Sequence, residues 1–197
     1  AMRDLEIRGA GSLVGDMQHG HMEQVGYDTY CKLLDEVVKE IQGIEVKEEQ
    51  DIQIDIDVSS YIPDSFIDNN SQKIEIYQNI ALCRTEEDIQ NVIDEIIDRY
   101  GHMPSELENL IEIARIKNLC RVANVIKISQ RKEKVVFYFD KAKFNPEIVD
   151  KLIKKYNTNI RFSTGIEPYV TVTIGSKIIE EIKGFLTYIQ NCTTSSL

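Results

Sequence analysis

Two side chains near the start of the chain, Arg8 and Gln18, lie among glycines in a spacing suited to binding another molecule. Residues 3–20 hold four glycines, two arginines and this glutamine. Glycine lets the backbone approach a partner closely, and arginine offers five donors in a fixed fork for a carboxylate, a phosphate or a carbonyl array. We therefore expect a loop that fits against something outside this chain. A flexible N-terminal arm is the simpler alternative.

The glycines do not match either familiar phosphate-binding loop. A P-loop requires a lysine after its last glycine, and Asp16 follows Gly15. A dinucleotide fingerprint requires G-x-G-x-x-G after a buried strand. Here the third glycine comes one residue late, and residues 5–8 make a poor buried strand. The spacing therefore argues against a phosphate cradle in this stretch.

No side chain elsewhere belongs to a recognisable catalytic motif. His19 and His21, with Asp16 nearby, could bind a metal ion, but such a pair in a loop is usually solvated. His102 lies in a turn, the serines lack a nucleophile elbow, and no cysteine has a histidine partner motif. We therefore expect no catalytic site, metal or cofactor in this chain.

The cysteines are widely separated and form no C-x-x-C pair. They are Cys31, Cys83, Cys120 and Cys192. This pattern favours buried reduced thiols in a cytoplasmic protein.

One acidic surface stands out on a helix that we expect to begin after Thr85, a good N-cap residue. Its inward face should be apolar: Ile89, Val92, Ile93, Ile96, Ile97 and Tyr100. Helical geometry turns the polar residues to the opposite side: Glu87, Asn91, Asp94, Glu95 and Asp98. Glu95 and Asp98 are neighbours at i and i+3. Such carboxylates are most often simply solvated, and the alternative is that a cation meets them.

The charge of the chain is unevenly distributed. The formal net charge is -10, yet residues 1–100 carry 8 basic and 23 acidic residues, and residues 101–197 carry 15 and 10. Acidic surfaces repel phosphate, so a basic protein surface is the more natural partner for the first half. No apolar run approaches membrane-spanning length, and no signal-peptide pattern opens the chain, so we expect no membrane partner.

The elements that must position these residues form an α+β pattern. Apolar spacing predicts helices over residues 27–42, 71–82, 86–100, 105–123, 146–156 and 177–189, with 193–197 frayed. Strands are predicted over 51–58, which alternates strictly, and over 125–128, 135–139, 159–163 and 169–174. We expect a helical N-terminal segment, residues 1–46, followed by a compact domain, residues 47–197, of helices packed on a small, mainly antiparallel sheet.

Several motifs resemble those of a known family. Residues 4–11 (Asp-Leu-Glu-Ile-Arg-Gly-Ala-Gly), with the Leu-x-Gly and Gln-x-Gly that follow, resemble the end of the translocation motif shared by bacterial transcription–repair coupling factors and RecG helicases. Residues 25–34 resemble the coupling factors specifically. Residues 97–101 (Ile-Asp-Arg-Tyr-Gly), Pro104 and residues 110–115 resemble the C-terminal domain of that family. Together the motifs make essentially the whole chain similar to the C-terminal end of a coupling factor.

The resemblance implies a regulatory and interaction module of a transcription-coupled DNA repair ATPase. In the family, an upstream motor that uses ATP and magnesium pushes along double-stranded DNA against stalled RNA polymerase, displaces it and recruits excision-repair proteins. Arg8 and Gln18 match positions that couple ATP hydrolysis to translocation, although Ser12 stands where relatives often have Asn or Glu. Glu95 and Asp98 match acidic positions that press against the N-terminal UvrB-like module and so hide the surface that recruits UvrA.

Two alternatives remain. A stand-alone α+β enzyme would have a deep pocket lined by polar groups with perturbed pKa values, whereas an interaction module would have a flat acidic patch. A RecG-type helicase tail would leave the residues beyond about Gly26 without a match.

Overall fold

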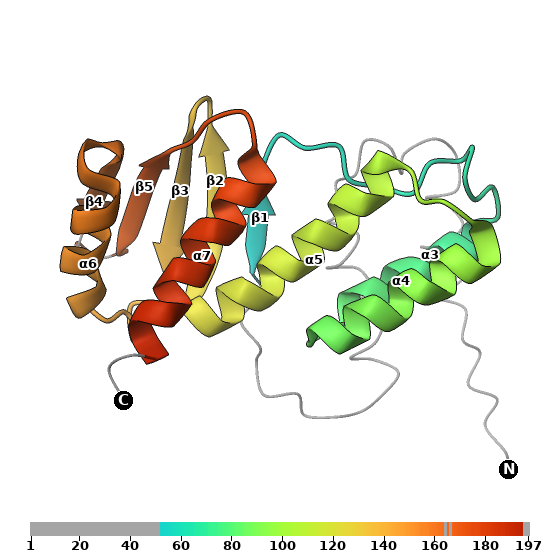
Figure 1. The fold of residues 1–197 in the computed structure, drawn as a ribbon, viewed down its shortest axis with the longest axis horizontal. Coiled ribbons are helices and arrows are strands. Elements are labelled where there is room, and N and C mark those ends of the chain that lie inside the picture. The colour runs from blue at the N-terminus through green and yellow to red at the C-terminus, as the bar shows by residue number, and fades with distance from the viewer. Residues whose placement is uncertain (1–51, 164, 166, 195–197) are drawn as a thin grey trace, which may run out of the picture.

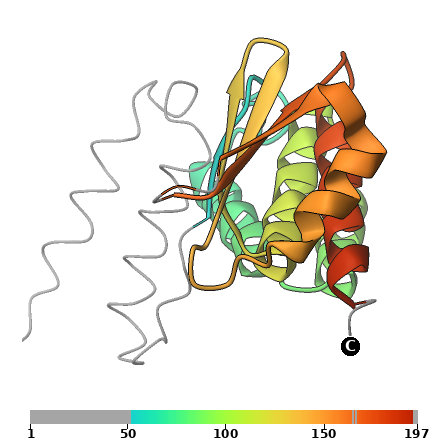
Figure 2. The ribbon, with the colours of Figure 1, turned by 90° about the vertical axis from the view of Figure 1, so that its left-hand side faces the viewer.

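The fold is a sheet covered on one face by helices, with two further helices packed beyond them (Figure 1, Figure 2). A computed structural model describes residues 52–163, 165 and 167–194. The elements are β1 (Gln53–Asp55), α3 (Asn70–Leu82), α4 (Glu86–Tyr100), α5 (Ser105–Ala123), β2 (Val125–Arg131), β3 (Lys134–Phe139), α6 (Glu147–Tyr156), the short 3-10 helix η1 (Asn157–Asn159), β4 (Ile160–Ser163), β5 (Tyr169–Thr173) and α7 (Ile178–Thr194). This arrangement confirms the predicted α+β class.

The five-stranded sheet has the order β1-β2-β3-β5-β4. Only the β1–β2 pair among these neighbours is parallel, and the other pairs are antiparallel. The predicted alternation of the first strand is confirmed, because Ile52 and Ile54 are buried whereas Gln53 and Asp55 are exposed. The strand itself is shorter than the predicted 51–58 and ends at Asp55.

β2 and β3, which cover the strands predicted over 125–128 and 135–139, form a hairpin around a two-residue turn. Lys132, the first turn residue, has a φ of 57°, which lets the chain reverse between closely paired strands. Phe137 of β3 then packs against Phe185 of α7, with ring centroids 4.3 Å apart. This contact fixes which face of the hairpin meets the helices.

α5 is the central element of the hydrophobic core. It packs against α7 and β2, and also against α3 and α4 (Figure 1). Its buried residues spread around much of the helix: Leu107, Leu110, Ile111, Ile113, Ala114, Ile116, Cys120 and Ala123. The same spread of apolar residues predicted this central position, and both predicted ends of the helix are confirmed.

α4 begins where Thr85 predicts it. The Thr85 hydroxyl accepts a hydrogen bond from the backbone N–H of Asp88 at 3.1 Å, and the Asp88 carboxylate accepts one from the Thr85 N–H at 2.8 Å. Hydrogen bonds from the backbone N–H groups of Arg84 and Thr85 lower the pKa of Asp88. Because this capping box satisfies donors at the helix end, it fixes the start of α4.

The apolar face of α4 is narrower than predicted. Ile89 and Ile96 are buried, and Val92 and Ile93 pack partly against the core. Ile97 is 48% exposed, so its predicted inward position is wrong. Since each residue turns about 100° around the helix axis, the residue next to a central core position such as Ile96 points well away from it.

The C-terminal half matches the predicted order of strands and helices. α7 buries Ile182, Phe185, Leu186 and Ile189 as expected. It continues to Thr194, so the predicted fraying from residue 193 begins too early. In the last turn, the Thr193 hydroxyl donates a hydrogen bond to the Ile189 carbonyl at 3.0 Å. This bond supports the helical backbone at the end of α7.

The predicted buried thiols are confirmed for Cys83, Cys120 and Cys192. Cys31, the predicted helix over residues 27–42 and the predicted boundary between residues 46 and 47 lie outside the described residues.

Leu110→Ala tests the central role of α5. Leu110 has no exposed surface, so the substitution should leave a cavity and lower the free energy of unfolding by about 2–5 kcal/mol. Urea unfolding followed by circular dichroism measures this loss. The matched control is Leu82→Ala, because Leu82 is 60% exposed and its loss should change stability by less than about 0.5 kcal/mol. Equal effects of the two substitutions would contradict the assigned core.

Candidate interaction site

The outer side of α4 carries a row of exposed carboxylates, which we call the α4 acidic face: Glu87, Asp94, Glu95 and Asp98. Figure 1 shows α4 beyond α5, away from the sheet. Burial of Ile89 and Ile96 on its inner side fixes the rotation of the helix about its axis. The predicted exposure of Glu95 and Asp98 is therefore confirmed, while their contact with a partner stays a prediction.

Glu95 already has a partner on its own helix. Nη1 of Arg99 lies 2.7 Å from Oε1 of Glu95 and 3.7 Å from Oε1 of Glu75 on α3. The hydrogen bond to Glu95 raises the pKa of Arg99, so the guanidinium stays charged. Asp98 forms no ion pair with any residue in the described part of the chain. A basic partner would thus meet an open carboxylate at Asp98 and would share Glu95 with Arg99.

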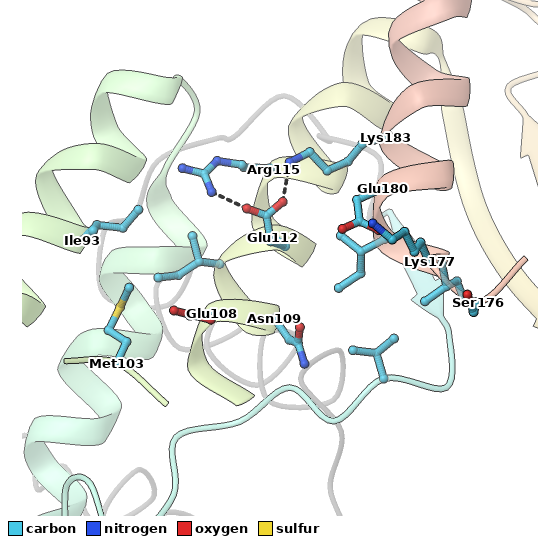
Figure 3. Close-up of a pocket in the computed structure, with 14 residues that line it drawn as sticks. Ile93, Met103, Glu108, Asn109, Glu112, Arg115, Ser176, Lys177, Glu180 and Lys183 are labelled. Atoms are coloured by element: carbon cyan, nitrogen blue, oxygen red, sulfur yellow. Dashed lines mark hydrogen bonds and ion pairs between the residues drawn. The ribbon is translucent and has the colours of Figure 1, made fainter. Parts of the chain in front are cut away.

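A second charged cluster joins three helices, and we call it the α4–α5–α7 network: Glu86, Glu112, Arg115 and Lys183. Nη2 of Arg115 on α5 lies 2.6 Å from Oε1 of Glu86 on α4, and its Nε lies 2.9 Å from the same oxygen. Arg115 and Lys183, which belongs to α7, both form ion pairs with Glu112 (Figure 3). The network therefore connects helices that are far apart in the sequence.

Two groups of this network, Glu112 and Arg115, are held in their charged forms. Burial acts to raise the pKa of Glu112, but hydrogen bonds from Lys183 and Arg115 outweigh burial and leave that pKa lowered. The hydrogen bond to Glu86 raises the pKa of Arg115. A general acid or base needs a pKa near the working pH, so both shifts run opposite to that requirement. The network suits a clamp between helices better than proton transfer.

A cavity of about 670 Å³ lies beside the network, between α5 and the start of α7 (Figure 3). Ile93, Met103 and Ile178 supply apolar lining, and Glu108 and Lys177 are among its charged residues. Its volume falls within the range of small-molecule sites, as the enzyme alternative requires. Its perturbed groups, however, are the paired charges just described.

The network was not predicted from the sequence. Glu112 and Arg115 are three residues apart on α5, which is a local signal that helical spacing could have supplied. Glu86 is 29 residues from Arg115, and Lys183 is 71 residues from Glu112. No local pattern connects these partners, so only the packing of the helices reveals them.

Several predicted residues lie outside the described part: Arg8, Gln18, His19 and His21. His102 is exposed in the turn between α4 and α5. Across residues 52–163, 165 and 167–194, no group of three or more His, Cys, Asp or Glu is placed to hold a metal ion. Within the same ranges, no helix combines the length and apolar character needed to cross a membrane.

Comparison with known proteins gives consistent matches. Residues 56–148 match the TRCF domain family. The transcription-repair-coupling factor of Bacillus subtilis (strain 168) is 41% identical over 136 residues, which cover 68% of this chain and 12% of that protein. The factor of Staphylococcus haemolyticus (strain JCSC1435) is 42% identical over 119 residues, or 59% of this chain and 10% of that protein. The matched region thus spans about a tenth of the length of these relatives.

A solved structure supports the fold alone. It is a crystal structure of the C-terminal domain of a transcription-repair coupling factor, with a TM-score of 0.62 and 22% sequence identity. The match covers 72% of this chain and 94% of that domain. The described α+β arrangement therefore has a counterpart in a solved structure.

Glu112→Gln tests the α4–α5–α7 network. At pH 7 it should lower the free energy of unfolding by about 1–3 kcal/mol, because Arg115 and Lys183 lose a charged acceptor. The pKa of Glu112 is lowered in the folded state. Its stabilising effect is therefore present above the ordinary pKa of 4.5 and is lost as the pH falls through the folded value. The stability difference from wild type, measured by urea unfolding, should narrow on acidification.

Glu108→Gln is the matched control, because Glu108 is exposed one turn earlier on α5. It should leave stability nearly unchanged at each pH. A wild-type advantage over Glu112→Gln that stayed constant from neutral to acidic pH would contradict the assigned role of the Glu112 carboxylate.

Proposed function

We infer, given that this chain belongs to the family of transcription-repair coupling factors as their C-terminal region, that it is the regulatory and interaction module of its parent protein. The observation that carries the proposal is the α4 acidic face. Its carboxylates are exposed, while the opposite side of the same helix is fixed in the core. A rigid row of exposed charge is suited to contact with a basic protein surface.

The proposed partner is the N-terminal UvrB-like module of the same protein. In the resting state, basic groups of that module would meet Glu95 and Asp98, and this contact would mask the surface that recruits UvrA. UvrA would then compete indirectly with the contact. The capping box at Thr85 and the burial of Ile96 support the proposal, because they keep the carboxylates in place before a partner arrives.

The remaining functions belong to other parts of the parent protein in this proposal. The names of the relatives indicate a role in DNA repair coupled to transcription. Other domains would bind RNA polymerase and double-stranded DNA, and the motor domains would hold ATP and magnesium. The chain itself would bind no nucleotide and catalyse no reaction, and the parent protein would act in the cytoplasm.

The alternatives have less support. A stand-alone enzyme has the cavity beside the α4–α5–α7 network in its favour. However, the pKa of Glu112 there is lowered and that of Arg115 is raised, so both shifts move away from neutral pH. A RecG-type helicase tail does not explain the match of residues 56–148 to the TRCF domain family.

Glu95→Ala combined with Asp98→Ala, made in the full-length parent protein, tests the proposed masking. The substitutions should expose the surface for UvrA and raise UvrA capture in a pull-down. Charge-assisted hydrogen bonds are worth about 1–3 kcal/mol each, so the closed form should be disfavoured roughly tenfold for each 1.4 kcal/mol lost. Wild-type capture should also rise with salt, because exposed pairs are screened.

Glu147→Ala combined with Asp150→Ala is the matched control. These exposed residues have the same i and i+3 spacing on α6 and remove the same charge elsewhere. The control should leave UvrA capture at the wild-type level. If the α4 variant kept its fold and captured no more UvrA than the control, the α4 acidic face would be only a solvated surface.

Arg8→Ala in the full-length protein tests the proposed coupling role of Arg8 and Gln18. The glycines beside Arg8 permit close approach to a partner, and the guanidinium can donate several hydrogen bonds. The variant should hydrolyse ATP but fail to displace a DNA triplex. Normal triplex displacement would contradict the role.

A further inference from the structure

The face of the sheet opposite the helices carries a set of aromatic and basic side chains. Figure 2 shows α5, α6 and α7 on one side of the sheet and no described helix on the other. Phe137 points to α7, where it meets Phe185, so its neighbour Tyr138 points to the side without described helices. The side that lacks described helices is therefore the side of Tyr138.

Strand register places five more side chains on the same side, since paired residues share a face. Tyr138 of β3 is opposite Lys127 of β2 and Tyr169 of β5, and Arg131 is opposite Lys134. Arg161 of β4 is opposite Thr171, which is itself opposite Val136, two residues before Tyr138. We call this set the basic-aromatic face: Lys127, Arg131, Lys134, Tyr138, Arg161 and Tyr169.

The two tyrosines form a continuous aromatic surface. Their ring centroids are 5.7 Å apart, and Tyr169 is 36% exposed. The ammonium of Lys127 lies 5.7 Å from the centre of the Tyr138 ring. The rings are thus available on neighbouring strands with a cation beside them.

Register also places Asp55 of β1 on this side, since Asp55 is opposite Ser129, which is opposite Val136. Four basic strand residues therefore stand against one acidic strand residue on this face. Arg131, Lys134 and Arg161 are exposed, and none of them forms an ion pair with another residue in the described ranges. All six residues of the face lie in the half of the chain that has 15 basic and 10 acidic residues. Its potential is therefore suited to an anionic partner, in contrast to the α4 acidic face.

We propose that the basic-aromatic face binds single-stranded nucleic acid. Bases would stack on Tyr138 and Tyr169, and phosphates would lie against Arg131, Lys134 and Arg161. Stacking needs unpaired bases, because the bases of a duplex already stack on one another, so a duplex should bind less well. A protein partner would require a larger apolar patch, and Val136, the aliphatic residue beside the tyrosines, is only 8% exposed.

Fluorescence anisotropy with the 197-residue chain tests this proposal. The probes are labelled 12-nucleotide strands of thymidylate and of uridylate, and a duplex of the same length. Both single strands should bind, and the duplex should bind at least about fivefold more weakly, which corresponds to the loss of one stacked base. With about three phosphate contacts, the logarithm of the affinity should fall against the logarithm of salt with a slope of about -2. A difference between the strands would show whether DNA or RNA is preferred.

Two variants separate stacking from charge. Tyr138→Thr combined with Tyr169→Thr keeps residues that favour strands and should weaken single-strand binding at least about tenfold, with an unchanged salt slope. Lys134→Gln combined with Arg161→Gln should make the slope shallower by about 1.4. Circular dichroism and thermal melts verify that each variant folds, and the second variant alters only exposed side chains.

Lys154→Gln combined with Lys177→Gln is the matched control, because it removes two exposed positive charges from the helical side of the domain. Its binding should equal that of wild type. Three outcomes would each overturn the proposal. One is no binding by the wild type, and another is equal binding of duplex and single strand. The third is an equal loss of affinity in the control and in the Lys134→Gln, Arg161→Gln variant.

Discussion

Burial of α5 on both of its sides is the constraint on which the rest of the described structure depends. Leu107, Leu110, Ile116 and Cys120 have no exposed surface. Desolvation raises the pKa of the Cys120 thiol far above its ordinary range, as expected for a group with no route to water. Because α5 needs apolar neighbours on both sides, the sheet and α7 cover one side, and α3 and α4 cover the other.

The α4–α5–α7 network occupies the seam where α5 meets its neighbours. The side chains of Arg115 and Glu112 keep 20% and 24% of their surface, so their charges are only partly desolvated. The free energy gained from such ion pairs is largely offset by the cost of dehydrating the charges. A different arrangement of the helices would leave a partly buried charge without its partner, which is unfavourable. Apolar burial drives the packing of the three helices, and the charges favour one mutual orientation.

Two surfaces that differ in charge have no described helix packed on them. The α4 acidic face lies on a helix whose inner side is buried in the core. The basic-aromatic face is the side of the sheet that the described helices do not cover. Since each surface lies on a rigid element, a partner would meet side chains already in place and would lose less conformational freedom on binding. The opposite charges favour different partners for the two surfaces.

Sequence alone determined the elements whose signals are local. Residues only a few positions apart decide the capping box at Thr85, the span of α5 and the alternation around Ile54. The helical period was likewise enough to predict that Glu95 and Asp98 are exposed. The same period failed for Ile97, because how wide a face is buried depends on the neighbouring helices. Tertiary structure alone decided which partners Glu86 and Lys183 have in the α4–α5–α7 network, and it alone brought Tyr138 next to Tyr169. These side chains become neighbours only through helix packing and strand order, and local periodicity carries no information about either.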